Sequence, residues 1–375
     1  MIVMKGKYNT ANIMIDTIDE TTKAQIQSFL NHPAFGNTYI AIMPDCHAGK
    51  GAVIGFTMKL NDYIIPNIVG VDIGCGMLAA RFGGFNKSVE NLDEFIKKQI
   101  PAGFKIHQEP PCPDSFNTDE LGKWTERIGM DYNRALLSIG TLGGGNHFIE
   151  AGEDSEGQTW ITVHSGSRNF GLRIADYFQN RAKALLEKFF IRNEYRELEF
   201  LPLDTQDGQD YLTAVRFAQS YASENRKTMM GIISQFIESE PIETIESVHN
   251  FIGDDDIIRK GATPADEGRR VIIPFNMRDG IALCTGKGSS KYNFSAPHGA
   301  GRILSRSKAR AQLSVSDFEK TMAEAGIYTT TATEETIDEA PDAYKDMNLI
   351  MENIQETVDV NTLIKPFYNF KAGGD

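Results

Sequence analysis

The chain has 375 residues, of which 41% are hydrophobic and 24% are charged. These values are typical of soluble globular proteins and exclude a collagen-like, a disordered or a disulfide-scaffold protein. The net charge of −13 argues against a broad basic groove for nucleic acid, although bound divalent cations or a local basic patch can reverse the sign inside a cleft.

The longest apolar stretches, such as Tyr63–Val71, are too short to span a bilayer, and the N-terminus lacks the pattern of a signal peptide. We therefore expect a cytoplasmic protein with no membrane partner. The cysteines are too few for a disulfide framework, so a functional thiol is expected to be a metal ligand or a nucleophile. They are Cys46, Cys75, Cys112 and Cys284.

Short apolar runs rich in β-branched residues alternate with glycine-rich turns along the chain, which predicts strands that lead into functional loops. Apolar residues at helical spacing predict helices over Ile174–Phe190 and Asp210–Ser239. We therefore expect an α+β fold with mixed sheets, a single domain over 1–375, and a helical insertion at 172–245. The predicted strands are Tyr39–Met43, Ile64–Val71, Trp160–Val163 and Val271–Ile273.

We predict that two acidic stretches, Glu194–Asp210 and Glu334–Asp342, are connections on the protein surface. Neither of them marks a domain boundary, because candidate site residues lie on both sides.

Four of the seven histidines lie inside glycine-rich segments, where the backbone allows a ligand to approach closely. Asp72 and Cys75 lie on one glycine-rich turn, and three histidines follow short apolar runs. Such a mixed oxygen, sulfur and nitrogen set suits zinc, manganese, iron or cobalt. The alternative is a buried cysteine beside a turn-capping aspartate, with histidines that are satisfied in the core. The three histidines are His147, His164 and His249.

His298 leads into Gly299-Ala300-Gly301-Arg302, so it could be a nucleophile beside an anion-binding turn. The basic run that follows, up to Arg310, could bind phosphate or could be a solvated helix face. Ser165–Arg168 could likewise hold a phosphate or simply form a turn. No Walker or dinucleotide-binding glycine motif is present.

Several longer motifs, in order along the chain, resemble the RtcB family of RNA-splicing ligases. The resemblance extends from about Met43 to Lys371. The motifs are MPDCHAGKGAVIG, VGVDIGCGM, GTLGGGNHFIE, HSGSR, the 210–226 helix, HN at 249–250, RKGA, SAPHGAGR and DEAPDAYKDM.

This resemblance implies a catalytic domain built around a central metal cleft, with GTP and two Mn²⁺ ions as cofactors. It implies the joining of RNA ends that carry a 3′-phosphate or 2′,3′-cyclic phosphate to 5′-hydroxyl ends, in RNA repair or tRNA splicing. His298 would attack GTP and form a histidine–GMP adduct. GMP would then be transferred to the RNA 3′-phosphate, and the 5′-hydroxyl would displace GMP. The implied partners are RNA ends, such as tRNA halves or damaged RNA, and an archease-type activator.

The resemblance also implies a role for each matching residue. The implied metal ligands are Asp72, Cys75, His147, His164 and His249, with Cys75 shared between the ions. The implied nucleotide contacts are Asn146, Glu150, Asn276, Gly299, Ala300, Gly301 and Lys371. The implied substrate contacts are Arg168, for an RNA phosphate, and Asp45 and His47, beside the metals.

One departure from the family concerns the nucleotide pocket. Where the family commonly has a Pro-Gly-Ser-Met turn, this chain has Pro274-Phe275-Asn276-Met277. Two alternatives to RNA joining stay open: GMP capping of 3′-phosphate DNA or RNA ends without joining, and a non-catalytic metal- or nucleic-acid-binding protein that retains the fold. The sequence does not determine the oligomeric state.

Overall fold

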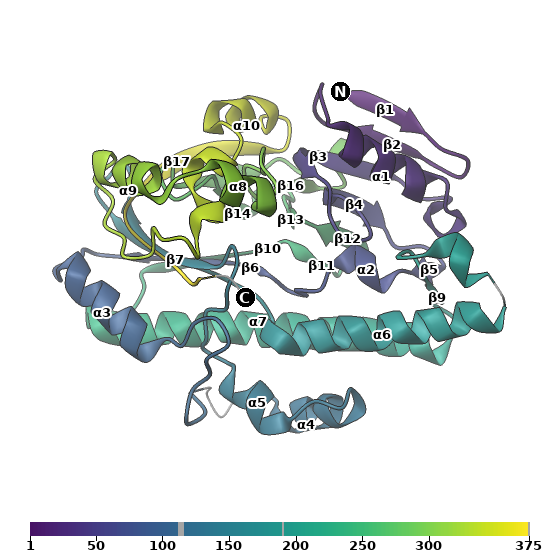
Figure 1. The fold of residues 1–375 in the computed structure, drawn as a ribbon, viewed down its shortest axis with the longest axis horizontal. Helices are drawn as coiled ribbons and strands as arrows, with labels where there is room; N and C mark the ends of the chain where they lie inside the picture. The colour runs from purple at the N-terminus through teal and green to yellow at the C-terminus, as the bar shows by residue number, and fades with distance from the viewer. Residues whose placement is uncertain (112–115, 190, 374–375) are drawn as a thin grey trace.

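The computed structural model describes residues 1–111, 116–189 and 191–373. Two large β-sheets form its centre, with helices outside them (Figure 1). The six-stranded sheet is mixed, because β2 and β3 run parallel and its other neighbouring strands run antiparallel. Its strands, in spatial order, are β1 (Ile2–Lys5), β2 (Thr10–Ile13), β3 (Ile40–His47), β4 (Ile54–Lys59), β12 (Ile257–Lys260) and β11 (Asn250–Ile252).

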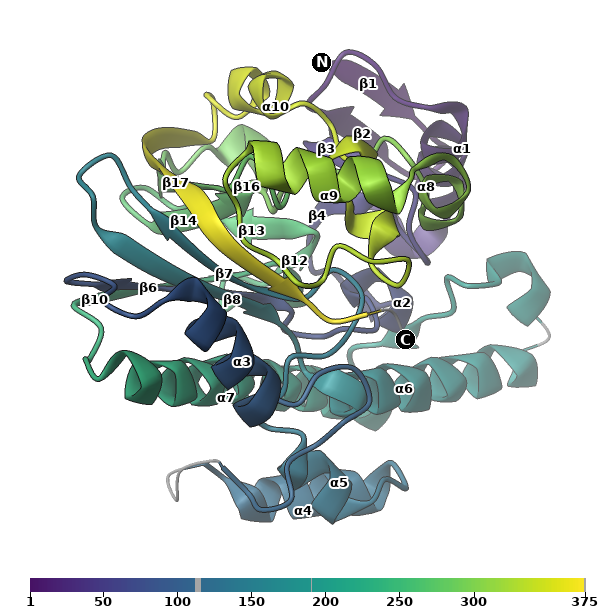
Figure 2. The same cartoon turned by 60° about the vertical axis from the view of Figure 1, so that its left-hand side comes forward.

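The seven-stranded sheet is antiparallel throughout. Strand β17, from the C-terminal end of the chain, lies between β7 and β15 and pairs with both (Figure 2). Lys371, the last residue of β17, is thereby brought opposite Phe148 at the start of β7. The strands, in spatial order, are β10 (Glu243–Val248), β6 (Gly76–Phe82), β8 (Thr159–Ser165), β7 (Phe148–Glu153), β17 (Val358–Lys371), β15 (Ile281–Gly286) and β14 (Arg270–Pro274).

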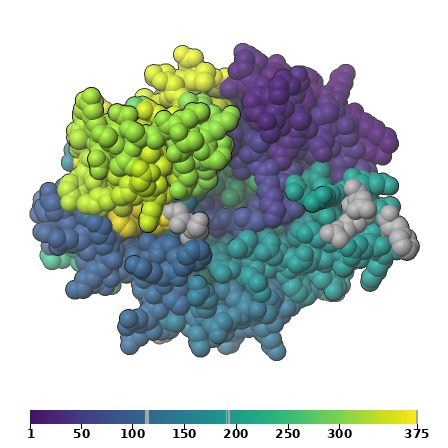
Figure 3. All heavy atoms as spheres, in the orientation of Figure 1, coloured from purple at the N-terminus to yellow at the C-terminus, as the bar shows by residue number. Residues whose placement is uncertain are grey.

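Two small sheets complete the β-structure, pairing β13 (Ala262–Pro264) with β16 (Ser295–Pro297) and β5 (Tyr63–Ile64) with β9 (Leu201–Pro202). The expected α+β class with mixed sheets is therefore confirmed. In Figure 3 the purple N-terminal segment and the yellow-green C-terminal segment meet on one face, above the blue and teal helical region.

Two long helices, α6 (Arg168–Lys188) and α7 (Gln206–Ile237), lie side by side beneath the sheets (Figures 1 and 2). Most of the helical stripe predicted from Tyr211 onward is buried. Its first part, from Tyr211 to Ala218, packs into the core of the six-stranded sheet, and Met229 and Ile233 pack into the core of the seven-stranded sheet. Apolar burial on one face drives this packing. The Thr205 side chain caps the start of α7, and Glu238 ends the helix in the left-handed conformation.

The remaining helices are short, and α4 and α5 lie on the far side of α6 and α7 from the sheets (Figures 1 and 2). No described helix is both long and apolar enough to cross a membrane. The α-helices are α1 (Glu20–Leu30), α2 (Pro66–Val69), α3 (Val89–Gln99), α4 (Thr118–Arg127), α5 (Tyr132–Leu137), α8 (Arg306–Gln312), α9 (Val315–Glu324) and α10 (Met347–Asn353). The 3₁₀ helices are η1 (Pro33–Phe35), η2 (Arg192–Tyr195), η3 (Ser290–Tyr292), η4 (Ile337–Glu339) and η5 (Pro341–Ala343).

Two of the four predicted strands lie within β8 and β14, a third coincides with part of β3 apart from Tyr39, and the fourth prediction is wrong. Ile64–Val71 forms the last residue of β5 and then helix α2. Pro66 at the first helical turn favours helix initiation, and Gly70, with φ of 97°, ends the helix. All four residues of α2 are buried, so the apolar run reflects a core position rather than a strand.

The two acidic stretches also differ from the surface connections expected for them. The stretch Glu194–Asp210 contains β9 and the first turn of α7. In Glu334–Asp342, Asp338 and Glu339 are each only 1% exposed. Arginine partners from α8 and its preceding loop make this burial possible. Cys112 lies outside the described residues, and the other three cysteines are free and buried.

Candidate metal and nucleotide site

The five predicted metal ligands converge at one edge of the seven-stranded sheet. Strands β6 and β7 begin at this edge, and the antiparallel strand β8 ends there. Asp72 and Cys75 precede β6, His147 precedes β7, and His164 lies near the end of β8. In the strand register, Gly76 pairs with Ser165 and with Val248, and Phe148 pairs with His164. His249, which follows Val248, therefore enters the same space.

The donor atoms of these side chains lie close together. The Cys75 Sγ is 3.4 Å from Nε2 of both His147 and His164, and His164 Nε2 is 3.3 Å from His249 Nε2. His147 Nε2 is also 3.0 Å from Asp72 Oδ2. A thiol, imidazole nitrogens and a carboxylate facing one buried point form a set that suits a divalent transition metal.

The electrostatics of this cluster fit a cation. Burial, reinforced by neighbouring positive charges, lowers the pKa of His164 and His249 well below the usual value, so both rings are neutral and can offer lone pairs. Burial, followed by the Asp72 charge, raises the pKa of Cys75 well above its usual value. A buried thiol of this kind ionises when a metal ion binds it. The Nδ1 atom of His147 is buried and has no hydrogen-bond partner in the described part of the chain.

His298 lies beside the cluster, and its ring centroid is 4.8 Å from that of His249. Its Nδ1 atom is 2.7 Å from Oδ2 of Asp45, a fully buried carboxylate at the end of β3. A proton on Nδ1 is donated to Asp45, so the lone pair of the singly protonated ring is on Nε2. Gly301 has φ of 72°, and a Cβ there would lie 2.3 Å from the Asp45 carbonyl oxygen. Only glycine fits that turn, which keeps His298 against β3.

A cavity of about 270 Å³ opens in front of His298 and the metal-ligand cluster. The structure thus brings together most of the residues predicted from the sequence. The lining residues among them are His47, Asp72, Cys75, Asn146, Glu150, His164, His249, Asn276, His298, Gly299, Ala300, Gly301 and Lys371. His47 also hydrogen-bonds through Nδ1 to the Asp45 backbone oxygen at 3.0 Å.

Two polar groups at the far wall of the cavity are held by β17. The Asn369 side chain donates a hydrogen bond to Glu150 at 2.8 Å, and Lys371 reaches Glu339 at 3.1 Å. Burial raises the pKa of Glu150 to about 8, although Asn369 and Lys371 oppose the shift. A carboxyl group with such a pKa is typical of a functional cleft.

Asn276, at the unusual turn, lines the cavity while its side chain is engaged locally. Its Nδ2 donates to Asp279 at 2.7 Å, and its Oδ1 accepts from the backbone nitrogens of Arg278 and Asp279. The residue therefore stabilises its own turn, and its predicted contact with the nucleotide stays a prediction.

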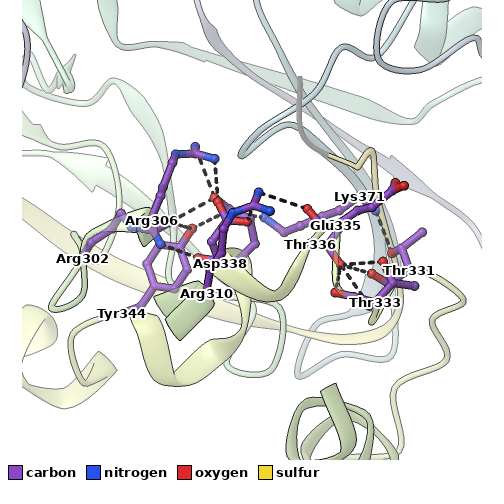
Figure 4. Close-up of polar contacts among 11 residues, drawn as sticks. Arg302, Arg306, Arg310, Thr331, Thr333, Glu335, Thr336, Asp338, Tyr344 and Lys371 are labelled. Atoms are coloured by element: carbon purple, nitrogen blue, oxygen red, sulfur yellow. Dashed lines mark hydrogen bonds and ion pairs between the residues drawn. The ribbon is translucent and has the colours of Figure 1, made fainter. Parts of the chain in front are cut away.

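A cluster of paired charges lies beside the cavity (Figure 4). The carboxylates of Asp338 and Glu339 are buried, and Arg302 and Arg306, which pair with them, line the cavity. Glu339 accepts from Arg302 at 3.0 Å and lies 3.3 Å from Arg306, while Asp338 pairs with Arg306 at 2.9 Å and with Arg310 at 2.7 Å. The sequence was compatible with two roles for Arg302, Arg306 and Arg310, phosphate binding or a solvated helix face. In the structure all three are paired with carboxylates.

Sequence reasoning did not identify Asp338, Glu339 and Tyr344 as site residues. Tyr344 donates to Glu339 and lines the cavity. The only available signal was their place in the DEAPDAYKDM motif. The acidic composition of that stretch pointed instead to the surface.

Arg168 lies in a second cavity, which Asp72 and His147 also line. It has φ of 56°, and its side chain donates to Thr141 Oγ1 at 3.0 Å and to the Gly103 carbonyl at 2.6 Å. The structure therefore places this predicted phosphate ligand near the cluster but outside the cavity that contains His298.

Comparison with known proteins gives a consistent result along most of the chain. The family described as tRNA-splicing ligase RtcB matches residues 25–127 and 118–372. The RNA-splicing ligase RtcB of Escherichia coli (strain K12) is 34% identical over 358 residues, covering 86% of this chain and 87% of the relative.

Archaeal relatives are more distant but match over a similar extent. The tRNA-splicing ligase RtcB of Aeropyrum pernix is 25% identical over 413 residues, covering 87% of this chain and 86% of the relative. The tRNA-splicing ligase RtcB of Nanoarchaeum equitans is 28% identical over 406 residues, covering 84% of this chain and 83% of the relative. Because the family match includes every segment that contributes to the buried cluster, the chain belongs to the RtcB family of tRNA-splicing ligases.

Proposed function

We propose that this protein is an RNA ligase that joins 3′-phosphate or 2′,3′-cyclic phosphate ends to 5′-hydroxyl ends, using GTP and Mn²⁺. The observation that carries the proposal is the position of His298, which lies against Asp45 and faces the cavity beside the metal-ligand cluster. Family membership supports the RNA ligase class. The nucleophile and the metal ligands that line the cavity support the proposed transfer of GMP through His298.

In the first step, Nε2 of His298 attacks the α-phosphorus of GTP. A nitrogen–phosphorus bond forms, the bond to the β-phosphate oxygen breaks, and pyrophosphate leaves. Asp45 accepts the Nδ1 proton in a hydrogen bond, which orients the ring and stabilises the positive charge that it gains. The turn Gly299–Gly301 lines the cavity next to the nucleophile and can accommodate phosphates against its backbone.

The residues that would hold two Mn²⁺ ions are Asp72, Cys75, His147, His164 and His249, with Cys75 shared. The ions would neutralise phosphate oxygens and stabilise entering and leaving oxygens during in-line displacement. Such neutralisation allows a chain of net charge −13 to hold RNA ends.

The remaining contacts divide between nucleotide and RNA. Asn146, Glu150 and Lys371 line the His298 cavity and would contact GMP, whereas Arg168 would hold an RNA phosphate. A cyclic phosphate is first hydrolysed to the 3′-phosphate, whose oxygen then takes GMP from His298. The RNA 5′-hydroxyl finally attacks the activated phosphate and displaces GMP.

The direct test is incubation of the protein with Mn²⁺ and α-labelled GTP, followed by a denaturing gel. We expect acid-labile, alkali-stable label on the wild-type protein and none on His298→Ala, with the metal content of the two proteins equal. Adduct formation by His298→Ala would show that another group is the nucleophile. A product gel with and without a 5′-hydroxyl partner strand then separates joining from capping of 3′-phosphate ends.

Three broader expectations belong to the same proposal. The RNA ends would be tRNA halves or damaged RNA, an archease-type protein would activate the enzyme, and the site of action would be the cytoplasm. Ligation assays with and without such an activator test the second of these.

A further inference from the structure

The second cavity, of about 280 Å³, borders the metal-ligand cluster at Asp72 and His147 and is not lined by His298. Asp72 and Asn146 line both cavities, and His147 lines only the second. A group in the second cavity can therefore reach the metal ligands while GTP occupies the first. The proposed reaction requires two ligands at the metal-ligand cluster, the guanine nucleotide on His298 and the RNA 3′-phosphate that accepts GMP from it.

The wall of this second cavity carries Phe104, which is 73% exposed and is the most exposed large hydrophobic residue in the described ranges. Its backbone is nonetheless firmly held. Leu142 N donates to the Pro101 carbonyl at 2.9 Å, and Gly103 N donates to the Gly143 carbonyl at 3.2 Å. The Gly103 carbonyl in turn accepts from Arg168 at 2.6 Å.

These bonds attach the Phe104 loop to the 140–147 segment that contains His147. The position of the aromatic ring is therefore coupled to the position of a metal ligand. The Phe104 ring is large, its loop is anchored, and the ring packs little against the rest of the protein. An exposed aromatic ring held in this way suggests a binding surface.

The charges around Phe104 favour an anionic ligand. Arg134 and Arg168 line the same cavity, and Lys105 is exposed next to Phe104. Among the described residues of the lining, Asp72 alone is a carboxylate, and it belongs to the metal-ligand cluster. An aromatic platform with cationic side chains around it is the usual arrangement for unpaired nucleotides, because every base can stack and every phosphate is negative.

We infer that the second cavity binds the 3′-terminal nucleoside of the RNA, with its base stacked on Phe104 and its 3′-phosphate directed toward Asp72 and His147. This inference rests on the proposed function, since it specifies how the RNA end enters the same site. Stacking would tolerate any base, so Phe104 would select an unpaired end rather than a sequence.

The test measures RNA affinity, not ligation. A 5′-labelled 3′-phosphorylated RNA is titrated with Mn²⁺-loaded protein in the absence of GTP, and fluorescence anisotropy reports binding. The RNAs are intact, abasic at the 3′-terminal nucleotide, or abasic at an internal position. The proteins are wild type, Phe104→Ala, Phe104→Tyr, and the matched control Phe189→Ala. Phe189 is 65% exposed and follows the last residue of α6, at the opposite end from Arg168.

We expect Phe104→Ala to bind the intact RNA about tenfold more weakly than wild type, because one stacked base contributes about that factor or more. Phe104→Tyr retains the ring and should keep wild-type affinity, as should Phe189→Ala. The terminal abasic RNA should bind wild type about tenfold more weakly and should show no further loss with Phe104→Ala.

Equal affinity of wild type and Phe104→Ala for the intact RNA would overturn the inference. So would a terminal abasic penalty that persists in Phe104→Ala, or one no larger than the internal penalty. Adduct labelling of the wild-type protein is scored separately. A failure there contradicts the proposed histidine–GMP chemistry and leaves the comparison of RNA affinities intact.

Discussion

His298 and Asp45 are 253 residues apart in the sequence, yet His298 Nδ1 lies 2.7 Å from the buried Asp45 Oδ2. The hydrogen bond determines which nitrogen of the singly protonated ring has the free lone pair. The carboxylate thereby acts through the histidine, as a positioning residue for the proposed nucleophile.

Asp45→Asn should slow formation of the histidine–GMP adduct by about 100-fold or more. An amide can donate to Nδ1 and so stabilise the tautomer whose proton is on Nε2, where it blocks attack. The measurement is the single-turnover rate of labelling with α-labelled GTP. Metal content and thermal midpoint serve as controls, and an unchanged labelling rate would remove Asp45 from the mechanism.

Cys75→Ser should weaken Mn²⁺ binding by at least about tenfold, because the hydroxyl group replaces the ligand sulfur at the centre of the cluster. Cys284→Ser is the matched control, since Cys284 is fully buried in β15, within a separate apolar cluster. Metal content after dialysis is measured on both variants. Equal retention of manganese would contradict the assignment of Cys75 as a ligand.

Glu339→Gln should destabilise the protein near neutral pH and much less in acid. Burial alone would raise the pKa of Glu339, but Lys371, Arg306 and Arg302 outweigh it and lower the pKa from its ordinary value of 4.5 to about 2. The ionised carboxylate thus stabilises the fold above about pH 4.5, and this contribution is lost as the pH falls toward 2.

The expected difference in unfolding free energy between wild type and Glu339→Gln is about 3 kcal/mol near pH 7. Urea unfolding of both proteins across the acid range measures it. A difference that is independent of pH would mean that Glu339 is not ionised in the folded state. Glu319→Gln, a change on the exposed face of α9, is the control and should have little effect.

Lys260→Met should stabilise the protein relative to wild type near neutral pH, with a benefit that declines as the solution becomes alkaline. Burial, together with the charge of Lys50, lowers the pKa of Lys260 from 10.5 to about 7. Its Nζ lies 3.3 Å from the Asn67 carbonyl oxygen. Between the two pKa values the unfolded chain binds the proton and the folded chain does not, so wild-type stability rises with pH.

The advantage of Lys260→Met should therefore fall by about 2 kcal/mol between about pH 7 and about pH 9. Denaturant unfolding of the two proteins at matched pH values gives the difference directly. Lys59→Met, at the exposed end of β4, should show no such trend. A constant difference for Lys260→Met would show that the buried lysine keeps its proton throughout this range.

Local features of this protein follow from its amino-acid sequence alone. The apolar stripes predicted α6 and α7, because helical periodicity depends on near neighbours alone. The glycine-rich turns around Cys75, His147 and His298 identified the residue types of a metal and nucleotide site. Their order along the chain supplied the resemblance to the family that the comparisons confirm.

Tertiary structure decided which of these residues meet. The insertion of β17 beside β7 places Lys371 opposite Phe148, and neither segment contains a signal for the other. Asp338 and Glu339 are buried only because Arg302, Arg306 and Arg310 converge on them. Local composition describes a residue's own preference for water, whereas burial and pairing depend on distant segments that the fold brings together.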